Sequence, residues 1–272
     1  MSIRTDLAVE ALPSSAPLPE GAEKRELRFC GIPCTLVEIR KESAARALQK
    51  PPGRYYTLHC PVFSQTAPEF PALVEALARV ISLLLPKEGA VLTAGLGNAS
   101  ITPDALGPET VRYLLATRHI DPSSMPPGLP PLRPAAAIAP GVLGQTGMES
   151  AEVLAALVRE TGPAAVIAVD ALAAGSLSRL GATVQVCDSG IAPGSGVANR
   201  RKELSRRTLG VPVVAVGVPT VADYAREDGP PMMVTPREID AIIHSASKAI
   251  AYAVDRALQP SLSLEDLAAL SD

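Results

Sequence analysis

The chain has 272 residues, 47% of them hydrophobic, and a formal net charge of −3 with a pI of about 5.7. This length and apolar content allow a sizeable buried core. The slight acidity, without basic segments interleaved with aromatics, argues against direct binding of nucleic acid. No segment has the apolar length of a signal peptide or a membrane span, so we expect a cytoplasmic protein without a membrane partner.

The N-terminal third is predicted to be rich in strands. A stretch rich in Pro, Ser and Ala, Leu12–Glu20, suggests a loose linker after a short N-terminal arm, and we assign residues 1–20 to that arm. Two β-rich runs follow, "ELRFCGIPCTLVEI" and "GRYYTLHCPV", separated by the charged stretch Arg40–Lys50. The segment "PALVEALARVISLLL" then has the pattern of a helix and leads into an apolar run at Val91–Ala94.

From Val91 onward, strand-like and helix-like segments alternate. The predicted helices lie around Pro108–Thr117, Glu149–Glu160 and Pro236–Leu258. The predicted strands are Ala135–Ile138, "AAVIAVD", "TVQVCD" and "VPVVAVGVP". Runs of Val and Ile without polar alternation indicate strands covered on both faces. The fold class is therefore α/β, with a largely parallel or mixed central sheet and flanking helices in three layers.

Three carboxylates follow predicted strands. Asp104 lies in the loop "GLGNASITPDALG" after Val91–Ala94, Asp170 closes "VIAVD", and Asp188 closes "VQVCD". Sheets of this class place catalytic groups just beyond the carboxyl ends of their strands. Two acids in one crevice do not easily both ionise, so one holds a proton while the other acts as a base toward water, which suits amide hydrolysis. The alternative is that each aspartate caps the helix that follows it.

Other chemistries have weaker support. "GLGN" is too short for a dinucleotide-binding fingerprint, and "GSG" at Gly194–Gly196 lacks the pattern of a nucleophilic serine elbow. The segment Gly190–Leu204 is either an anion-binding loop, with Arg200, Arg201 and Lys202 behind its glycines, or a mobile loop with a basic edge.

Neither a metal site nor a disulfide is predicted. His59, His119 and His244 are scattered, without a second ligand at helical or hairpin spacing. The four cysteines, Cys30, Cys34, Cys60 and Cys187, form no paired CxxC set, so we expect free thiols. No cofactor is expected either.

Seven blocks of the sequence follow one another in a distinctive order: "IRTDLAVEA", "GRYYTLHCP", "GLGNASITPDALGPETVRYLLATRHI", "APGVLGQTGMES", "VIAVDALAAGSLSRLGATVQVCDSGIAPGSGVANRRKELS", "LGVPVVAVGVPTVAD" and "MVTPREID". Together they resemble the germination proteases of spore-forming bacteria. The resemblance extends over nearly the whole chain and implies a single peptidase domain over residues 1–272. It also implies a phosphorylase/hydrolase-like fold similar to that of hydrogenase-maturation proteases.

The resemblance implies an atypical aspartic endopeptidase that degrades small acid-soluble spore proteins in the germinating spore core. Its two essential aspartates correspond to Asp104 and Asp170. Asp188 ranks as a supporting group, and Gly194, Ser195 and Gly196 are expected to supply amide donors beside the pair. The alternatives are a small-molecule hydrolase or phosphorylase of the same fold, and a non-catalytic binding protein.

The chain departs from the family pattern at two places. Longer members carry a large insertion between "VGVPT" and "MVTP", where this chain has only "VADYAREDGPP" after Thr220. The resemblance implies a tetramer, so a homo-oligomer is expected. Members are also made with a removable segment ahead of "IRTDLAVEA", whereas only Met1 and Ser2 precede Ile3 here, so we expect no functional prosegment.

Overall fold

A computed structural model describes residues 5–13, 15–61, 63, 67–121, 123, 131–193, 202–224 and 232–271, apart from the side chains of Tyr224 and Ser271. Within these residues the strands form one mixed sheet in the order β1-β2-β3-β7-β8-β6-β4-β5, and β9 also pairs with β8. The strands are β1 (Ala22–Phe29), β2 (Ile32–Ile39), β3 (Gly53–His59), β4 (Val91–Gly95), β5 (Ala135–Ile138), β6 (Ala165–Ala174), β7 (Thr183–Cys187), β8 (Val213–Tyr224) and β9 (Met232–Val234).

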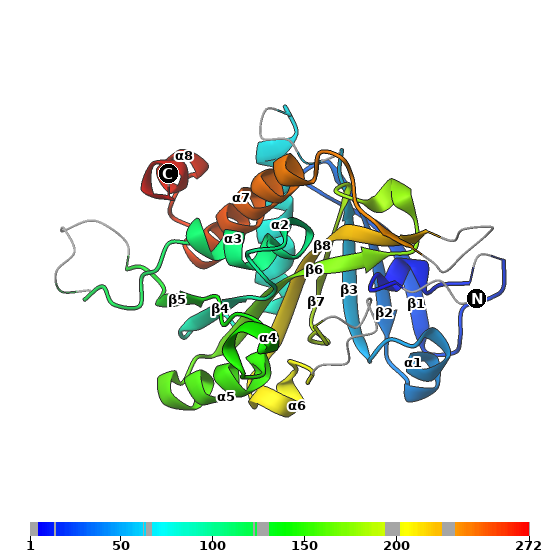
Figure 1. Cartoon of the computed structure of the whole chain (residues 1–272), viewed down its shortest axis with the longest axis horizontal. Coiled ribbons are helices and arrows are strands. Elements are labelled where there is room, and N and C mark those ends of the chain that lie inside the picture. Colours follow the sequence, from blue (N-terminus) through cyan, green and yellow to red (C-terminus); the bar gives the residue numbers. More distant parts are fainter. Residues whose placement is uncertain are drawn as a thin grey trace.

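Helices cover both faces of this sheet, which gives three layers (Figure 1). The upper layer in Figure 1 contains α2 (Phe70–Leu84), α3 (Leu106–Arg112) and α7 (Ile239–Leu258), with α8 (Leu264–Ser271) beside α7. The lower layer contains α1 (Glu42–Leu48), α4 (Leu143–Thr146), α5 (Ser150–Thr161) and α6 (Arg206–Leu209). The described residues also include the short 3-10 helices η1 (Ala8–Glu10), which precedes β1, and η2 (Thr102–Asp104) and η4 (Leu177–Arg179), which lie in connections.

The two faces of the sheet carry separate hydrophobic cores because side chains alternate along each strand. On β6, Ile167 and Val169 pack in the core that α2 and α7 cover, whereas Val166 and Ala168 pack with α5. A further core joins α1 to β2, β3 and β7. The lower face is therefore covered by α5 on one side and by α1 on the other.

The predicted fold class is confirmed, and the sheet is mixed rather than largely parallel. Strands β5, β4, β6 and β8 run parallel, while β7, β3, β2 and β1 continue the sheet with antiparallel pairs. Four of the described helices were not predicted: α1, α4, α6 and α8. Of these, α1 lies within the charged stretch Arg40–Lys50 and buries Ala44, Ala45 and Leu48.

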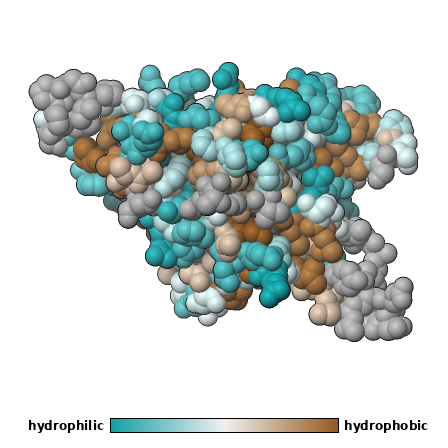
Figure 2. Space-filling view, turned by 90° about the horizontal axis from the view of Figure 1, so that it is seen from above, coloured by the Kyte–Doolittle hydropathy of each residue, from teal (hydrophilic) through white to brown (hydrophobic). Residues whose placement is uncertain are grey.

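The surface carries apolar side chains in separate patches. Figure 2, which views the molecule from above, shows these patches among hydrophilic residues. Among the described residues, Leu83, Ile101, Met148 and Leu177 are half exposed or more. No helix in the described part of the chain has both the length and the apolarity that crossing a bilayer requires.

Candidate active site

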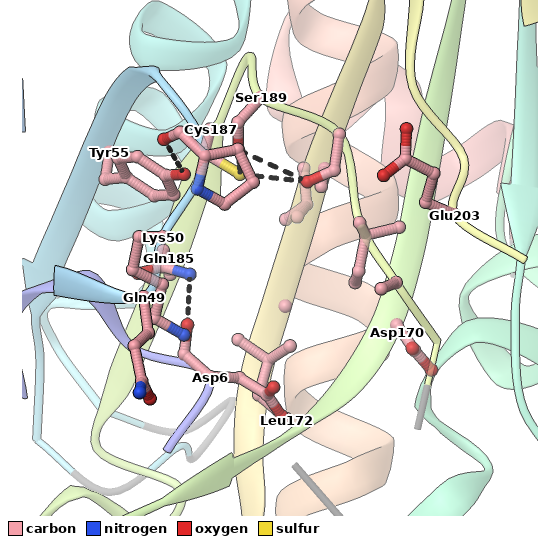
Figure 3. Close-up of a pocket in the computed structure, with 17 residues that line it drawn as sticks. Asp6, Gln49, Lys50, Tyr55, Asp170, Leu172, Gln185, Cys187, Ser189 and Glu203 are labelled. Carbon is pink, nitrogen blue, oxygen red and sulfur yellow. Dashed lines mark hydrogen bonds between the residues drawn. The ribbon is translucent and has the colours of Figure 1, made fainter. Parts of the chain in front are cut away.

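A groove opens on the lower face of the sheet, between the cores that α5 and α1 cover, and encloses a cavity of about 200 Å³. Its floor comes from neighbouring strands. Figure 3 shows Asp170 and Glu203 on one side of the groove and Tyr55, Lys50 and Gln185 on the other. The remaining described residues that line it are Asp6, Gln49, Pro51, Leu172, Cys187, Ser189, Gly190, Ile191, Ala192, Ala215, Val216 and Gly217.

Asp170 lies inside β6 rather than at its end, because the strand continues to Ala174. Side chains alternate along a strand, so Asp170 lies on the same face of the sheet as Val166 and Ala168, which is the face of the groove. Only 4% of Asp170 is exposed. Its Oδ1 accepts a hydrogen bond from the Ala171 N–H over 3.0 Å. A carboxylate is thus fixed in the floor of the groove, within a strand that is otherwise apolar.

Asp104 ends η2, in the connection between β4 and α3, and is partly exposed. Its Oδ2 accepts the Asn98 N–H over 2.8 Å, which closes the loop back onto the glycine turn after β4. Gly97 has a φ of +111° there, and a Cβ at Gly97 would lie 2.0 Å from the Asp104 carbonyl oxygen. The turn therefore requires glycine at this position, both for its conformation and for the close approach of the two backbones.

Backbone contacts bring the Asp104 loop onto β6 and β8. Leu96 donates its N–H to the Val169 carbonyl over 2.8 Å, one residue before Asp170. Gly107, just after Asp104, packs so closely that a Cβ there would lie 2.5 Å from the same carbonyl oxygen. The Thr220 hydroxyl on β8 donates to the Pro103 carbonyl over 2.7 Å. These contacts fix the Asp104 loop at the place where β4 ends beside β6, next to Asp170, but Asp104 itself does not line the groove that Asp170 lines.

Helix capping does not account for these two aspartates. The N-cap of α3 is Ala105, and no side chain caps that helix. Asp104 instead accepts from Asn98, which precedes it in the chain. Asp170 stands in mid-strand, with no helix directly after it.

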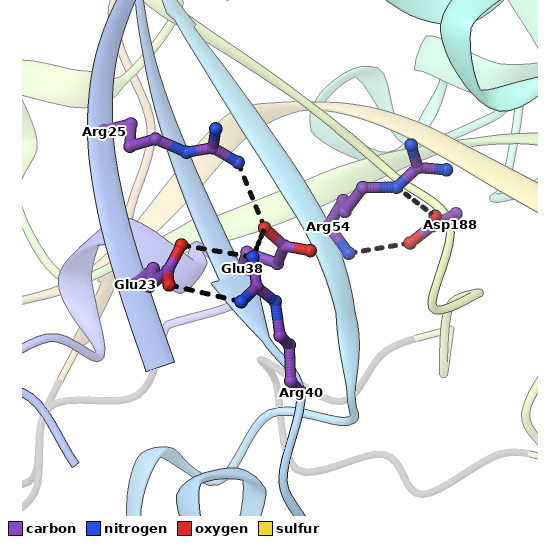
Figure 4. Close-up of polar contacts among 6 residues, drawn as sticks. All are labelled: Glu23, Arg25, Glu38, Arg40, Arg54 and Asp188. Atoms are coloured by element: carbon purple, nitrogen blue, oxygen red, sulfur yellow. Dashed lines mark hydrogen bonds and ion pairs between the residues drawn. The ribbon is translucent and has the colours of Figure 1, made fainter. Parts of the chain in front are cut away.

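Asp188 lies apart from this region. We expected its strand to end at the same edge of the sheet, but β7 runs antiparallel to β8, so its carboxyl end points the opposite way. Asp188 accepts two hydrogen bonds from Arg54, from the backbone N–H over 2.7 Å and from Nε over 2.8 Å. Figure 4 shows this pair beside a separate surface network of Glu23, Arg25, Glu38 and Arg40. Asp188 does not line the groove, and its rank as a supporting group stays a prediction.

The glycine-rich segment is described only in part. Gly194, Ser195, Gly196, Arg200 and Arg201 lie outside the described residues. Gly190 and Ile191 border the groove, and Ile191 pairs with Leu204. The Lys202 ammonium group contacts Glu152 on α5 over 2.6 Å.

Several polar residues of the groove were not predicted, among them Gln185, Lys50 and Asp6. Gln185 on β7 is 6% exposed; its Oε1 accepts the Ala8 N–H over 2.8 Å, and its Nε2 donates to the Asp6 carbonyl over 3.2 Å. Lys50 donates to the Thr5 carbonyl over 2.8 Å. Burial lowers the pKa of Lys50, and the Asp6 carboxylate opposes that effect. The only local signal for any of these residues is the polar Gln185 inside the apolar run "TVQVC".

The candidate metal ligands stay apart in the described structure. His59 shares a hydrogen bond with Thr35, and His244 with Tyr113. Among the described residues, no three His, Cys, Asp or Glu side chains are grouped so that they could hold an ion. The four cysteines are free thiols, as predicted; burial raises the pKa of both Cys34 and Cys60 to about 12.

Comparison with known proteins identifies the family. The family model described as germination protease matches residues 19–228, which include both Asp104 and Asp170. Curated germination proteases are similar to the chain: one from Priestia megaterium is 43% identical over 240 residues, and one from Clostridium tetani is 36% identical over 322 aligned positions. The chain therefore belongs to the germination protease family.

The two relatives are covered to different extents. The match with the Priestia megaterium protein spans 82% of this chain and 64% of the relative, whereas the match with the Clostridium tetani protein spans 98% of each. Among solved structures, a nickel–iron hydrogenase maturation protease, HycI, from Thermococcus kodakarensis KOD1 matches 64% of this chain and 98% of its own. Its TM-score is 0.38 and its identity 16%, so this likeness says nothing about activity.

Proposed function

We propose that the chain is an endopeptidase of an atypical aspartic type that begins the degradation of small acid-soluble spore proteins when a spore germinates. Asp104 and Asp170 are the proposed catalytic pair. The observation that carries the proposal is the carboxylate of Asp170, which is 4% exposed and lines the groove. Membership of the germination protease family supports the substrate class.

The proposed reaction uses the two carboxylates in complementary protonation states. One of them, ionised, takes a proton from a water molecule that attacks the scissile carbonyl. The other, protonated, polarises that carbonyl and then gives its proton to the leaving nitrogen. Each carboxylate accepts a backbone N–H, Asp104 from Asn98 and Asp170 from Ala171, and these bonds help to hold both groups in place.

The proposal also covers the amide donors beside the catalytic pair and the oligomeric state. We place Gly194, Ser195 and Gly196 beside the tetrahedral intermediate as amide donors, because Gly190 already borders the groove. A homotetramer acting in the spore core completes the proposal, and its support is the resemblance to the family.

Incubation of the purified chain with a small acid-soluble spore protein, followed by gel electrophoresis, tests the function. Discrete early fragments are expected, and their formation should survive treatment with a chelator. An intact substrate under conditions that keep the enzyme folded would favour a small-molecule hydrolase of this fold. Activity that disappears with chelator and returns with a divalent metal would reassign Asp104 and Asp170 as metal ligands.

A further inference from the structure

The N-terminal segment Thr5–Ala11 packs against the end of β6 beside the groove. Leu7 and Ala8 are 0% and 1% exposed, and Leu7 packs against Leu172, two residues beyond Asp170. Its closest polar contacts to β6 are those of Asp6. Asp6 donates its N–H to the Ala173 carbonyl over 2.8 Å, and its Oδ2 accepts the Ala173 N–H, also over 2.8 Å.

Within the described residues no strand pairs with this edge of β6 beyond the end of β4, and these two bonds take the place of such a partner. β4 ends at Gly95, and its last contact with β6 along this edge is the bond from Leu96 to Val169. Backbone groups on one edge of a strand recur every second residue, so Ala171 and Ala173 face the side that β4 has left. An edge without a partner is free to fray. Asp6 satisfies both backbone groups of Ala173 and so fixes the strand three residues after Asp170.

Asp6 is itself held from the opposite side of the groove. The buried Gln185 donates to its carbonyl over 3.2 Å, as Figure 3 shows. Gln185 pairs with Gly217 on β8, and Gly217 pairs with Asp170 on β6, so these three residues lie in one row across the sheet. Lys50 anchors the preceding residue through the Thr5 carbonyl. Asp6, Gln185 and Lys50 all line the groove together with Asp170.

We propose that Asp6 is a positioning residue of the catalytic site, which sets the position of the Asp170 carboxylate through Ala173 and the end of β6. The proposal rests on the proposed function of Asp170. It assigns no proton transfer to Asp6, because the Asp6 carboxylate already accepts a backbone N–H and the segment is fixed on both sides of it. The requirement at this position is for an acceptor of the right length.

The test compares Asp6→Ala, Asp6→Asn and the matched control Glu10→Gln. Glu10 belongs to the same segment but does not line the groove. Its carboxylate accepts a hydrogen bond from the Gly175 N–H over 2.7 Å and forms an ion pair with Arg179 over 3.2 Å. Asp6→Ala is expected to lower kcat about 10- to 100-fold, the scale of a small displacement of a catalytic group. Asp6→Asn, whose amide oxygen still accepts, should recover most of that loss with the same pH profile as the unaltered protein. Glu10→Gln should lower the melting temperature while its kcat, measured well below that temperature, stays within about threefold.

Three outcomes would overturn the proposal. A normal kcat in folded Asp6→Ala would leave Asp6 a purely structural role. An inactive Asp6→Asn, or one with a shifted pH profile, would make Asp6 part of the proton transfer. An equal loss of kcat in Glu10→Gln would show that activity depends on the packing of the whole segment Thr5–Ala11 and not on Asp6 in particular. If the unaltered protein fails to cleave the spore protein, the proposed function fails first, so the two failures are distinguishable.

Discussion

Leu96 donates its backbone N–H to the carbonyl oxygen of Val169 over 2.8 Å, and this bond joins the loop that carries Asp104 to the strand that carries Asp170. The two aspartates are 66 positions apart in sequence; Asp170 directly follows Val169, and Asp104 follows Leu96 by eight residues. A displacement of the loop would therefore move Asp104 relative to Asp170. Several substitutions test how tightly the site depends on this geometry.

Replacement of either proposed catalytic aspartate by asparagine should abolish most activity. Asp104→Asn and Asp170→Asn are each expected to lower kcat by about 10²-fold or more, because an amide neither gives nor accepts the working proton. Cleavage of an acid-soluble spore protein gives the rate, and circular dichroism with thermal unfolding verifies the fold. Retention of most activity in either folded variant would remove that residue from the pair.

Asp188→Asn should act on stability more than on catalysis. The variant loses the charge that pairs with Arg54 Nε, and we expect the free energy of unfolding to fall by about 1–2 kcal/mol. Urea unfolding measures the loss of stability, and kcat under conditions that keep the variant folded measures the effect on catalysis. If kcat fell as far as in Asp104→Asn, Asp188 would belong to the catalytic machinery after all.

Gly97→Ala should disturb Asp104 without replacing any charged residue. The new methyl would meet the Asp104 carbonyl oxygen at 2.0 Å in a backbone conformation with a φ of +111°, so the loop must shift. We expect a loss of roughly 1–3 kcal/mol in the free energy of unfolding and a larger proportional loss in kcat. Gly144→Ala is the matched control, because no atom lies within 4 Å of the added methyl. A crystal structure of Gly97→Ala with an unmoved loop would contradict this account.

Asp255 should make stability fall as the pH rises toward neutrality. This residue on α7 is 1% exposed, and burial raises its pKa to about 7, although a hydrogen bond from the Leu115 N–H opposes the shift. Between its unfolded pKa near 4 and about 7, the folded state holds a proton that the unfolded chain has lost. The resulting stabilisation is complete below the unfolded pKa and is lost as the pH rises through the folded value.

Asp255→Asn should remove that dependence. Its amide oxygen still accepts the Leu115 N–H, so the variant is expected to be more stable than the unaltered protein near pH 8, with a smaller difference near pH 5. Urea unfolding at both pH values measures this. Asp240→Asn, on the exposed first turn of the same helix, controls for the loss of one negative charge. Equal differences at the two pH values would contradict the assigned protonation.

Cys30→Asn should stabilise the first hairpin. Cys30 and Gly31 form the two-residue turn between β1 and β2, with φ values of 48° and 84°. Turns with positive φ at both central residues favour Asn-Gly, so a gain of about 0.5–1 kcal/mol is expected. Thermal unfolding measures the gain. A thiol-reactive dye should then label the folded variant far more slowly, because Cys30 is the one exposed cysteine of the four. An unchanged labelling rate would show that another thiol reacts.

The fold class was predictable because its signal is local. Val- and Ile-rich runs such as "VIAVD" predict buried strands wherever they pair, and the amphipathic pattern of α2 and α7 is equally local. The antiparallel half of the sheet was not predictable in this way, because the pairing of β3 with β7 depends on segments far apart in the chain. Helix α1 was missed because seven residues among charges give little periodicity.

The two proposed catalytic aspartates could be singled out from the sequence, and their role stays a prediction. Asp104 and Asp170 stand out because each breaks or follows an apolar run. Gln185 also breaks an apolar run, but nothing local connects it with Asp6 or Asp170: the Asp6 contacts with Ala173 and Gln185 join residues 167 and 179 positions apart. Only the order of the strands brings them into one groove.

The bond between Asp6 and Ala173 also bears on how the chain folds during its synthesis. Asp6 leaves the ribosome early, but its partner follows 167 residues later. At 5–20 residues per second, the N-terminal segment waits roughly 8–33 s for β6, and β1, β2 and β3 wait for β7 over a comparable interval. The groove is therefore assembled only after most of the chain has been translated, and a truncated nascent chain that ends before β6 contains Asp104 but lacks Asp170, the other half of the proposed catalytic pair.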